Sequence, residues 1–305
     1  MDNPLVSVGI PTYNRPEGLR RTLKCITGQT YKNLEIIVSD NCSPGPETEV
    51  VVREFMARDS RIQYYRQGEN RGPGFNFKFV FEKASGEYFM WAADDDEWEP
   101  FYAERIINEF RTLGEDFIAI NLEAQYVDDN YKKFDYFAEG QGFYKFSSKS
   151  GTSRLKHLIK FNYGNLVYSI YRMSSFKKIK NMIFVENEIP FMLQIMEYGN
   201  WRVIPKVGFY KKTNKATYTQ AKWEMCGGWL PKQNHSFQNF PIRTWYTLRY
   251  HWVALLNIKY SISNLNINNP DKIFLNIVAS WRIIIHFLSL TIRFKRSNFL
   301  SEKGV

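Results

Sequence analysis

Short apolar runs alternate with amphipathic stretches along the first hundred residues of the chain. Residues 5–10 form a β-branched run, and the polar segment 11–15 follows it and leads to Pro16, where a helix can begin. The same alternation recurs along the chain up to a fourth apolar run. We therefore expect strands at 5–10, 34–38, 62–65 and 88–92, with helices that start at 16, cover 48–58 and end at 84. This spacing is typical of βαβ units and of a mostly parallel sheet buried on both faces.

Polar residues stand where three of these strands end. They are the segment 11–15, the pair Asp40-Asn41 and the triplet of residues 94–96. In an open α/β sheet, ligands bind outside the carboxyl ends of the strands. We therefore expect the three groups to lie along one edge of the sheet and to form one site.

The triplet Asp94-Asp95-Asp96 is the most informative of the three, because a wholly apolar strand ends there in adjacent carboxylates. Carboxylates so close together repel one another unless they are solvated or neutralised, and Mg²⁺ or Mn²⁺ is often bound by one or two carboxylates together with substrate phosphates. A solvated turn would contain the same residues. Neither GxGxxG nor GxxxxGK occurs in the chain, so we expect no Rossmann dinucleotide site and no P-loop. Phosphates would then be held through a metal.

Five motifs occur in order: Pro11-Thr12-Tyr13-Asn14-Arg15, Asp40-Asn41, Asn70-x-Gly72-x-x-x-Asn76, Gly86-Glu87-Tyr88 and Asp94-Asp95-Asp96. Together they resemble the family 2 glycosyltransferases, and their combined order and spacing are far more specific than any one of them. The resemblance implies the GT-A fold, an α/β fold with a Rossmann-like, mostly parallel central sheet. It also implies a catalytic domain over 1–215, with a nucleotide-sugar half over about 1–112 and an acceptor half over about 113–215.

The resemblance implies a role for each matched position. Asp40 would accept a hydrogen bond from an imide N–H of the base, which suits uracil or thymine. Thr12 would line the base and ribose pocket, and Asp94 would face the ribose hydroxyls. Asp95 would bind Mn²⁺ or Mg²⁺ at the donor diphosphate, with Asp96 as a further candidate ligand. The implied nucleotide-binding residues are Pro11, Thr12, Tyr13, Asn14, Arg15, Asp40, Asn41, Arg71, Asn76 and Asp94.

Two of these roles have alternatives. Arg71 would offset the charge of the diphosphate, but a solvated loop arginine is an equal interpretation. Ala93 stands where many members of the family carry an acidic residue. This departure weakens the expected ribose contact of Asp94 more than the metal contact of Asp95.

An inverting transferase needs a general base that takes the proton from the attacking acceptor hydroxyl. The family places an acidic pair ahead of an amphipathic helix, and residues 185–199 match that arrangement with Asn187 in place of the first acidic residue. Glu188 is the expected base, with Glu186 as the second choice. Acidic residues at this position would also stabilise the helix N-terminus by about 0.3 to 1 kcal/mol without any catalytic role. Further on, residues 201–207 indicate a returning strand.

The last third of the chain, residues 216–305, is aromatic and basic. Beyond Pro241 it contains nine Lys or Arg against two acidic residues, which supplies +7 of the formal charge of +10. Apolar residues recur at helical spacing over 273–292, while Asn276, Arg282 and His286 interrupt that stretch and disfavour a transmembrane span. We expect an amphipathic helical extension that binds an anionic membrane surface. Packing of this helix on the catalytic domain is the alternative.

The sequence therefore predicts a metal-dependent, inverting glycosyltransferase with Mn²⁺ or Mg²⁺ as cofactor. It would move a sugar from a nucleotide-diphosphate sugar, UDP being favoured, to a glycan or lipid-linked acceptor of bacterial surface polysaccharide synthesis. Residues 1–4 lead directly into the first strand, so we expect no secretory signal and a cytoplasmic, peripheral location at the inner membrane. The three cysteines lack metal-site spacing. The rival interpretations are a nucleotidyltransferase and a non-catalytic membrane or nucleic-acid binding protein; we expect no nucleic-acid partner, and the oligomeric state stays open.

Overall fold

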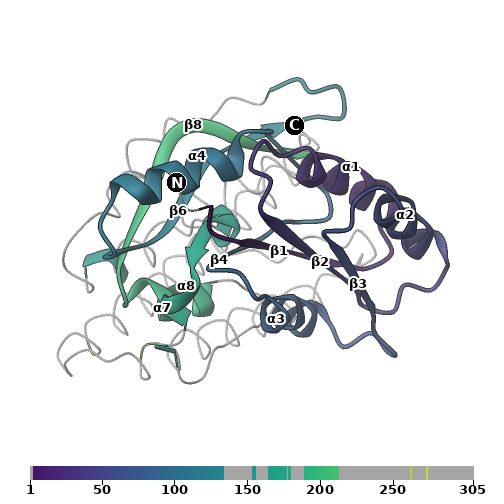
Figure 1. The fold of residues 1–305 in the computed structure, drawn as a ribbon. Helices are drawn as coiled ribbons and strands as arrows, with labels where there is room; N and C mark the ends of the chain where they lie inside the picture. Colours follow the sequence, from purple (N-terminus) through teal and green to yellow (C-terminus); the bar gives the residue numbers. More distant parts are fainter. Residues whose placement is uncertain are drawn as a thin grey trace, which may run out of the picture.

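The computed structural model describes residues 3–133, 153–155, 164–176, 178–179, 189–212, 262 and 273. Strands and helices alternate through its first half, as the hydrophobic pattern predicts (Figure 1). In chain order the elements are β1 (Val6–Thr12), α1 (Pro16–Thr27), β2 (Leu34–Asp40), α2 (Glu47–Met56), β3 (Ile62–Arg66), α3 (Pro73–Glu82), β4 (Tyr88–Trp91), β5 (Asp96–Trp98), α4 (Tyr102–Thr112), β6 (Phe117–Val127), η2 (Gly164–Tyr168), β7 (Ile170–Arg172), α7 (Met173–Phe176), α8 (Ile189–Met196) and β8 (Asn200–Lys212).

The strands form one sheet in the order β3-β2-β1-β4-β7-β6-β8-β5. The first four strands of this order run parallel, because each is joined to the next in the chain by a crossover helix. β7 is antiparallel to both β4 and β6, β8 is parallel to β6, and β5 closes the edge antiparallel to β8. The sheet is thus mixed, with a parallel half that matches the expected βαβ units and a second half that the sequence predicts only at β8.

Two apolar layers cover the two faces of this sheet. α1, α2 and α4 pack on one face, over Val6, Val8 and Ile10 of β1. α3, α7 and α8 lie on the other face, where Phe89 and Trp91 of β4 form the centre of an aromatic cluster. All residues of β1, β2 and β4 are buried, which confirms the prediction of strands covered on both faces. None of the helices within the described residues is long and apolar enough to cross a membrane.

Gly9 in β1 lets α3 approach the sheet closely. A Cβ atom at this position would lie 2.7 Å from Val80 Cγ2 and 3.0 Å from Phe89 Cζ. Gly9→Ala is therefore expected to lower the free energy of unfolding by about 1–3 kcal/mol, the usual range for an overpacked core. Urea denaturation measures the change. Gly68→Ala serves as the control, because nothing lies within 4 Å of a Cβ atom there; equal stability losses in the two variants would contradict the prediction.

The structure extends several of the predicted elements. β1 continues through Pro11 to Thr12, and β2 continues to Asp40, because the ends of the two strands pair in parallel register. The expected loop residues Pro11 and Thr12 are therefore strand residues. The predicted return strand is longer too, since β8 continues to Lys212. Asp96 is not part of a simple turn, because it begins the short strand β5.

Other predictions fall on residues outside the described ranges. These are the proposed bases Glu186 and Glu188 and the predicted extension 216–305 except residues 262 and 273. The expected domain boundaries at 112 and 215 also stay predictions.

Candidate functional site

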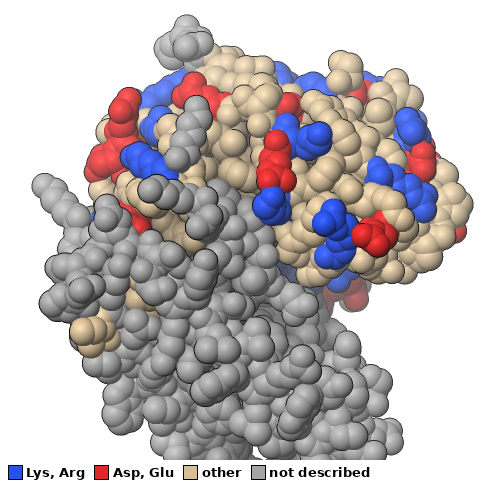
Figure 2. All heavy atoms as spheres, turned by 90° about the horizontal axis from the view of Figure 1, so that it is seen from below, with Lys and Arg blue, Asp and Glu red and all other residues tan. Residues whose placement is uncertain are grey.

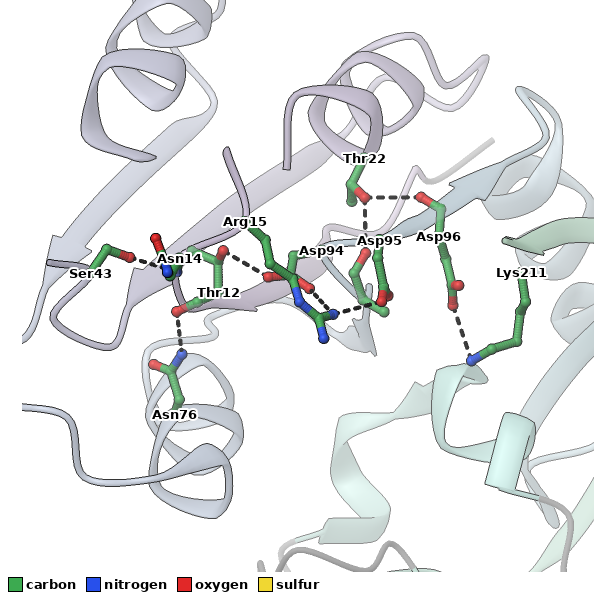
Figure 3. Close-up of polar contacts among 11 residues, drawn as sticks. Thr12, Asn14, Arg15, Thr22, Ser43, Asn76, Asp94, Asp95, Asp96 and Lys211 are labelled. Carbon is green, nitrogen blue, oxygen red and sulfur yellow. Dashed lines mark hydrogen bonds and ion pairs between the residues drawn. The ribbon is translucent and has the colours of Figure 1, made fainter. Parts of the chain in front are cut away.

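The carboxyl ends of β1 and β4 lie at the switch point of the sheet. From β1 the chain moves outward to β2 and β3, and then returns to place β4 on the other side of β1. Ligands of open α/β sheets bind where the strand order reverses in this way. Thr12 ends β1 there, and its Oγ1 donates a 2.8 Å hydrogen bond to Asp94 Oδ2 beyond the end of β4 (Figure 3).

Residues Asp94–Asp96, which we call the acidic turn, are held by the first helix. Thr22 of α1 lies within 2.9 Å of the carbonyl oxygens of both Ala93 and Asp96, which share its hydroxyl proton. Gly18 lies one turn earlier, and a Cβ atom there would come within 2.3 Å of the Asp94 carbonyl oxygen. α1 can therefore lie directly against the turn only because residue 18 has no side chain. The backbone of the turn is fixed before any ligand binds.

The three carboxylates of the acidic turn differ in their surroundings. The side chains of Asp94 and Asp96 are 10% and 3% exposed, whereas that of Asp95 is 49% exposed. Burial and the nearby Asp95 raise the pKa of Asp94 to about 6, although Arg15 and Thr12 favour its charged form. Asp95 is the carboxylate most open to a ligand. Its role at a metal, and that of Asp96 as a further ligand, stay predictions.

Asp96 pairs with a cation from the opposite half of the chain. It lies directly across the β5–β8 pair from Lys211, whose Nζ is 3.3 Å from Asp96 Oδ2 (Figure 3). Burial raises the pKa of Asp96 to about 6, although Lys211 favours the carboxylate. Burial opposes the charge of Lys211, but Asp96 raises the pKa of the ammonium well above its usual value. At neutral pH the two groups therefore form an ion pair, and the Asp96 carboxylate is already engaged.

Removing the cation should destabilise the fold. Lys211→Met leaves the Asp96 carboxylate buried without a counter-charge, so we expect the free energy of unfolding to fall by about 2–3 kcal/mol, somewhat less than for a fully buried pair because the Lys211 side chain is 23% exposed. Urea denaturation measures the loss. Adding Asp96→Asn should recover most of it. The control Lys206→Met, on the same strand, removes a lysine whose Nζ lies 3.9 Å from the Phe101 ring centroid, and should cost under about 1 kcal/mol. A Lys211→Met protein as stable as the wild type would contradict the ion-pair interpretation.

A second group of polar contacts, which we call the Asp40 cluster, lies at the end of β2 around Asp40. The Asp40 carboxylate is buried and accepts hydrogen bonds on Oδ1 from the backbone N–H and the hydroxyl of Ser43, at 2.8 and 2.6 Å. Tyr64 donates to Oδ2 at 3.0 Å. Ser43 Oγ in turn accepts a 2.8 Å hydrogen bond from Asn14 N in the loop after β1. Asp40 and the segment 11–15, which are far apart in sequence, therefore meet at one edge.

The remaining predicted residues hold the surrounding loops. The Asn41 amide donates to Asn70 Oδ1 and to Gly72 O and accepts from Arg71 N. The Asn76 amide donates to the carbonyl oxygens of Thr12 and Ser39, at 3.2 and 2.9 Å, and accepts from Ser39 Oγ. Its hydrogen-bonding groups are thus used between the ends of β1 and β2. Asn76 thus holds the backbone at the ends of β1 and β2. Its predicted role in nucleotide binding stays a prediction.

The exposed side chains of the loops lie at the rim of the site. Tyr13 is exposed, and Asn14 has φ +54°, a left-handed conformation that asparagine tolerates. Arg71 lies 3.9 Å from the Phe75 ring centroid, which favours a stacked guanidinium over a freely solvated one.

Sequence reasoning did not single out Thr22, Ser43 or Tyr64. The spacing of Ser43 three residues after Asp40 is that of a local side-chain turn and could have indicated the contact. Thr22 and Tyr64 reach the site through packing of α1 and β3, and no local signal identifies them.

The described residues contain no group of three His, Cys, Asp or Glu arranged around a common metal position. The acidic turn offers instead one accessible carboxylate, Asp95, next to the more buried Asp94. Mg²⁺ and Mn²⁺ accept oxygen ligands and often take only one or two from the protein, the rest from water and substrate phosphates. The donor set therefore fits a metal that binds together with a diphosphate better than a metal held by the protein alone.

The sequence is similar to that of a known protein family and of several bacterial proteins. A family model described as glycosyl transferase family 2 matches residues 7–180, more than half of the chain. A GalNAc(5)-diNAcBac-PP-undecaprenol beta-1,3-glucosyltransferase of Campylobacter jejuni is 41% identical over 95 residues, which are 31% of this chain and 30% of that protein. The putative colanic acid biosynthesis glycosyl transferase WcaA of Escherichia coli is 35% identical over 101 residues, 32% of this chain and 35% of that protein. The chain thus spans about a third of the length of these relatives.

Solved structures share the fold. Staphylococcus aureus TarS 1-349, crystallised with UDP-GlcNAc, aligns with a TM-score of 0.59 and 16% identity over 91% of this chain and 72% of that one. The mannosyltransferase PcManGT from Pyrobaculum calidifontis, in complex with GDP-Man and Mn²⁺, aligns with a TM-score of 0.58 and 14% identity over 100% of this chain and 80% of that one. At these identities the likeness establishes the fold alone, which is the predicted GT-A fold.

Proposed function

The chain belongs to glycosyl transferase family 2, and from this premise we propose that it transfers a sugar from a nucleotide-diphosphate sugar to a hydroxyl group of a glycan or lipid-linked acceptor. The observation that carries the proposal is the Thr12–Asp94 hydrogen bond at the switch point, because Thr12 also pairs with Asp40 across β1 and β2 and so joins the Asp40 cluster to the acidic turn. A nucleotide that lies across this edge would place its base near Asp40 and its diphosphate near Asp95.

We propose that the nucleotide is UDP. Asp40 Oδ1 already accepts two hydrogen bonds from Ser43, whereas Oδ2 accepts one from Tyr64 and keeps capacity for another. The N3–H of uracil is a donor of the required kind. Tyr13, which is exposed and follows Thr12 directly in the chain, would supply an aromatic face for the base. The TarS structures with UDP and UDP-GlcNAc support this choice by analogy of fold.

We propose that Asp95 holds Mn²⁺ or Mg²⁺ together with the donor diphosphate, with Asp96 as a further candidate ligand. Such an ion offsets the charge that develops on the leaving diphosphate. We propose that Asp94 contacts a ribose hydroxyl; its hydrogen bond to Thr12 at the end of β1 supports this role. The PcManGT complex with Mn²⁺ supports divalent metal use in this fold.

The acceptor hydroxyl must lose its proton as its oxygen attacks the anomeric carbon from the face opposite the leaving group. Glu188 is the proposed base, and Glu186 is the second choice. Both precede α8, whose Phe191 packs against Trp91 at the end of β4. The helix is thereby anchored under the same strand that leads to the acidic turn, which supports a base on the segment before α8.

We propose further that the acceptor belongs to bacterial surface polysaccharide synthesis and that the enzyme works at the cytoplasmic face of the inner membrane. The relatives from Campylobacter jejuni and Escherichia coli support the first part through their names. On the described part of the face in Figure 2, Lys and Arg are interspersed with Asp and Glu. An anionic surface would then be bound by the basic residues beyond 241.

Thermal shift against UDP, dTDP, CDP and GDP, each with and without Mn²⁺, tests the donor site. We expect a Tm increase that needs Mn²⁺ and is largest with UDP. Turnover of the matching sugar nucleotides, followed by release of the free diphosphate, then identifies the sugar. No stabilisation by any nucleotide at saturating concentration would contradict the proposed donor site, and strong salt-dependent binding of RNA would favour the nucleic-acid interpretation.

A further inference from the structure

Arg15 places a single nitrogen between two carboxylates of the acidic turn. Its Nη1 lies 2.6 Å from Asp95 Oδ2 and 3.3 Å from Asp94 Oδ1 (Figure 3). The third carboxylate, Asp96, has its own cation in Lys211. The guanidinium is therefore the positive charge that Asp94 and Asp95 share, and it lies against the oxygens that a cation bound by both residues would need.

The guanidinium can leave this position without disturbing the residues around it. The Arg15 backbone is fixed, because its carbonyl oxygen accepts a 2.9 Å hydrogen bond from Leu19 N in the first turn of α1. Its side chain is 52% exposed, and solvent weakens the attraction between such half-exposed charges. Asp94, in contrast, is held by Thr12. Moving the Arg15 side chain therefore leaves Asp94 in place and frees the Asp95 carboxylate for another cation.

A divalent cation and the guanidinium would repel each other if both contacted the same carboxylate oxygens. A donor diphosphate changes this balance, because its oxygens attract both positive groups and match the planar donors of arginine. We infer that Arg15 is an exchangeable counter-ion of the acidic turn: it neutralises Asp94 and Asp95 in the free enzyme, yields them to the metal, and then binds the donor diphosphate. This inference rests on the proposed donor site and metal role of Asp95.

The variant Arg15→Ala separates the two halves of the exchange. Without nucleotide, its Mn²⁺ affinity should be about three- to tenfold higher than that of the wild type, because the competing cation is gone. With saturating Mn²⁺, its UDP affinity should be about tenfold lower, while uridine, which lacks the diphosphate, should bind as it does to the wild type. Electron paramagnetic resonance of free Mn²⁺ measures the first quantity, and calorimetry measures the second.

Arg20→Ala is the matched control. It removes the same charge five residues later, within α1, but Arg20 pairs with Glu54 and not with the acidic turn. If both variants gained the same Mn²⁺ affinity, the cause would be the loss of a nearby positive charge and not the loss of the Arg15 contact. That result would overturn the proposed exchange. An Arg15→Ala protein that binds Mn²⁺ no better than the wild type would overturn it as well.

Failure of the inference and failure of the proposed function give different results. If the wild type binds UDP in a Mn²⁺-dependent way that Asp95→Ala abolishes, the donor site stands whatever Arg15→Ala does. If the wild type binds no nucleotide, the donor site itself fails, and the exchange fails with it.

Discussion

Asp95→Ala is expected to lower kcat/KM for sugar transfer by about 100-fold or more and to abolish the Mn²⁺ dependence of UDP binding. The carboxylate is the most exposed of the acidic turn and the proposed contact of the metal that offsets charge on the leaving diphosphate. Loss of one electrostatic group that acts on developing charge typically costs two to three orders of magnitude, about 10²–10³ in rate. Stability should change little, because the Asp95 side chain is half exposed and Arg15, its ion-pair partner among the described residues, is half exposed too.

The experiment compares initial rates and UDP affinities of the two proteins with and without Mn²⁺. Glu82→Ala is the matched control, since it removes an exposed carboxylate from the end of α3, whose ion pair is with Lys78. The control should keep wild-type activity. Wild-type activity in Asp95→Ala would show that another residue contacts the metal. Asp96 would be the next candidate, although it would first have to separate from Lys211.

Glu188→Gln is expected to lower kcat by about 10²–10⁴ and to leave UDP affinity unchanged. The amide keeps the size of the side chain but cannot take a proton from the acceptor hydroxyl. The separation of kcat from nucleotide affinity matters, because a residue that merely stabilised the start of α8 would lower stability and leave the chemical step intact. Rates at saturating donor and acceptor, together with calorimetric UDP binding, measure the two quantities.

Glu186→Gln is the internal comparison for this prediction. It makes the same chemical change two residues earlier, and we expect at most a few-fold loss. A large loss of kcat in Glu186→Gln, together with wild-type kcat in Glu188→Gln, would make Glu186 the base. Wild-type rates in both variants would place the base elsewhere in the acceptor half.

The parallel half of the fold could be predicted from local sequence. The runs at β1, β2 and β4 are β-branched or aromatic, bounded by turn residues, and buried on both faces, so their periodicity and length identify them as strands. Only the ends differ: Pro11 and Thr12 look like a loop in sequence, but parallel pairing with Ser39 and Asp40 makes them strand.

The antiparallel half could not be predicted in the same way. β5 has three residues and begins with a carboxylate, and β7 has three residues between two helical segments. Such short strands exist because β8 and β6 offer edges to pair with, which is tertiary information. β8 itself is predicted from its apolar residues, but its extension through Lys211 depends on pairing with β5 and β6.

The sequence predicted which residues belong to the candidate site better than it predicted their hydrogen-bond and ion-pair partners. The family motifs identify Thr12, Asp40 and the acidic turn, and the structure places them on one edge of the sheet. Adjacent residues of one sequence motif nevertheless have different partners: Asp94 bonds to Thr12, and Asp96 pairs with Lys211. Asn76 reads in sequence as a ligand residue, whereas its amide bridges two strand ends. These partners depend on which segment of the chain packs against each residue, and motif spacing alone does not predict that.

The Asp96–Lys211 pair has a consequence for recombining this enzyme with others. Asp96 belongs to the segment that carries the donor motifs, and Lys211 belongs to the last described strand, more than a hundred residues later. A chimera that keeps residues 1–112 and takes its remaining sequence from another transferase inherits the carboxylate without its cation. Grafts whose strand opposite Asp96 carries Lys or Arg should express as folded protein, and grafts without one should need Asn at position 96. Exchange of acceptor specificity by module swapping is therefore constrained at one cross-strand position.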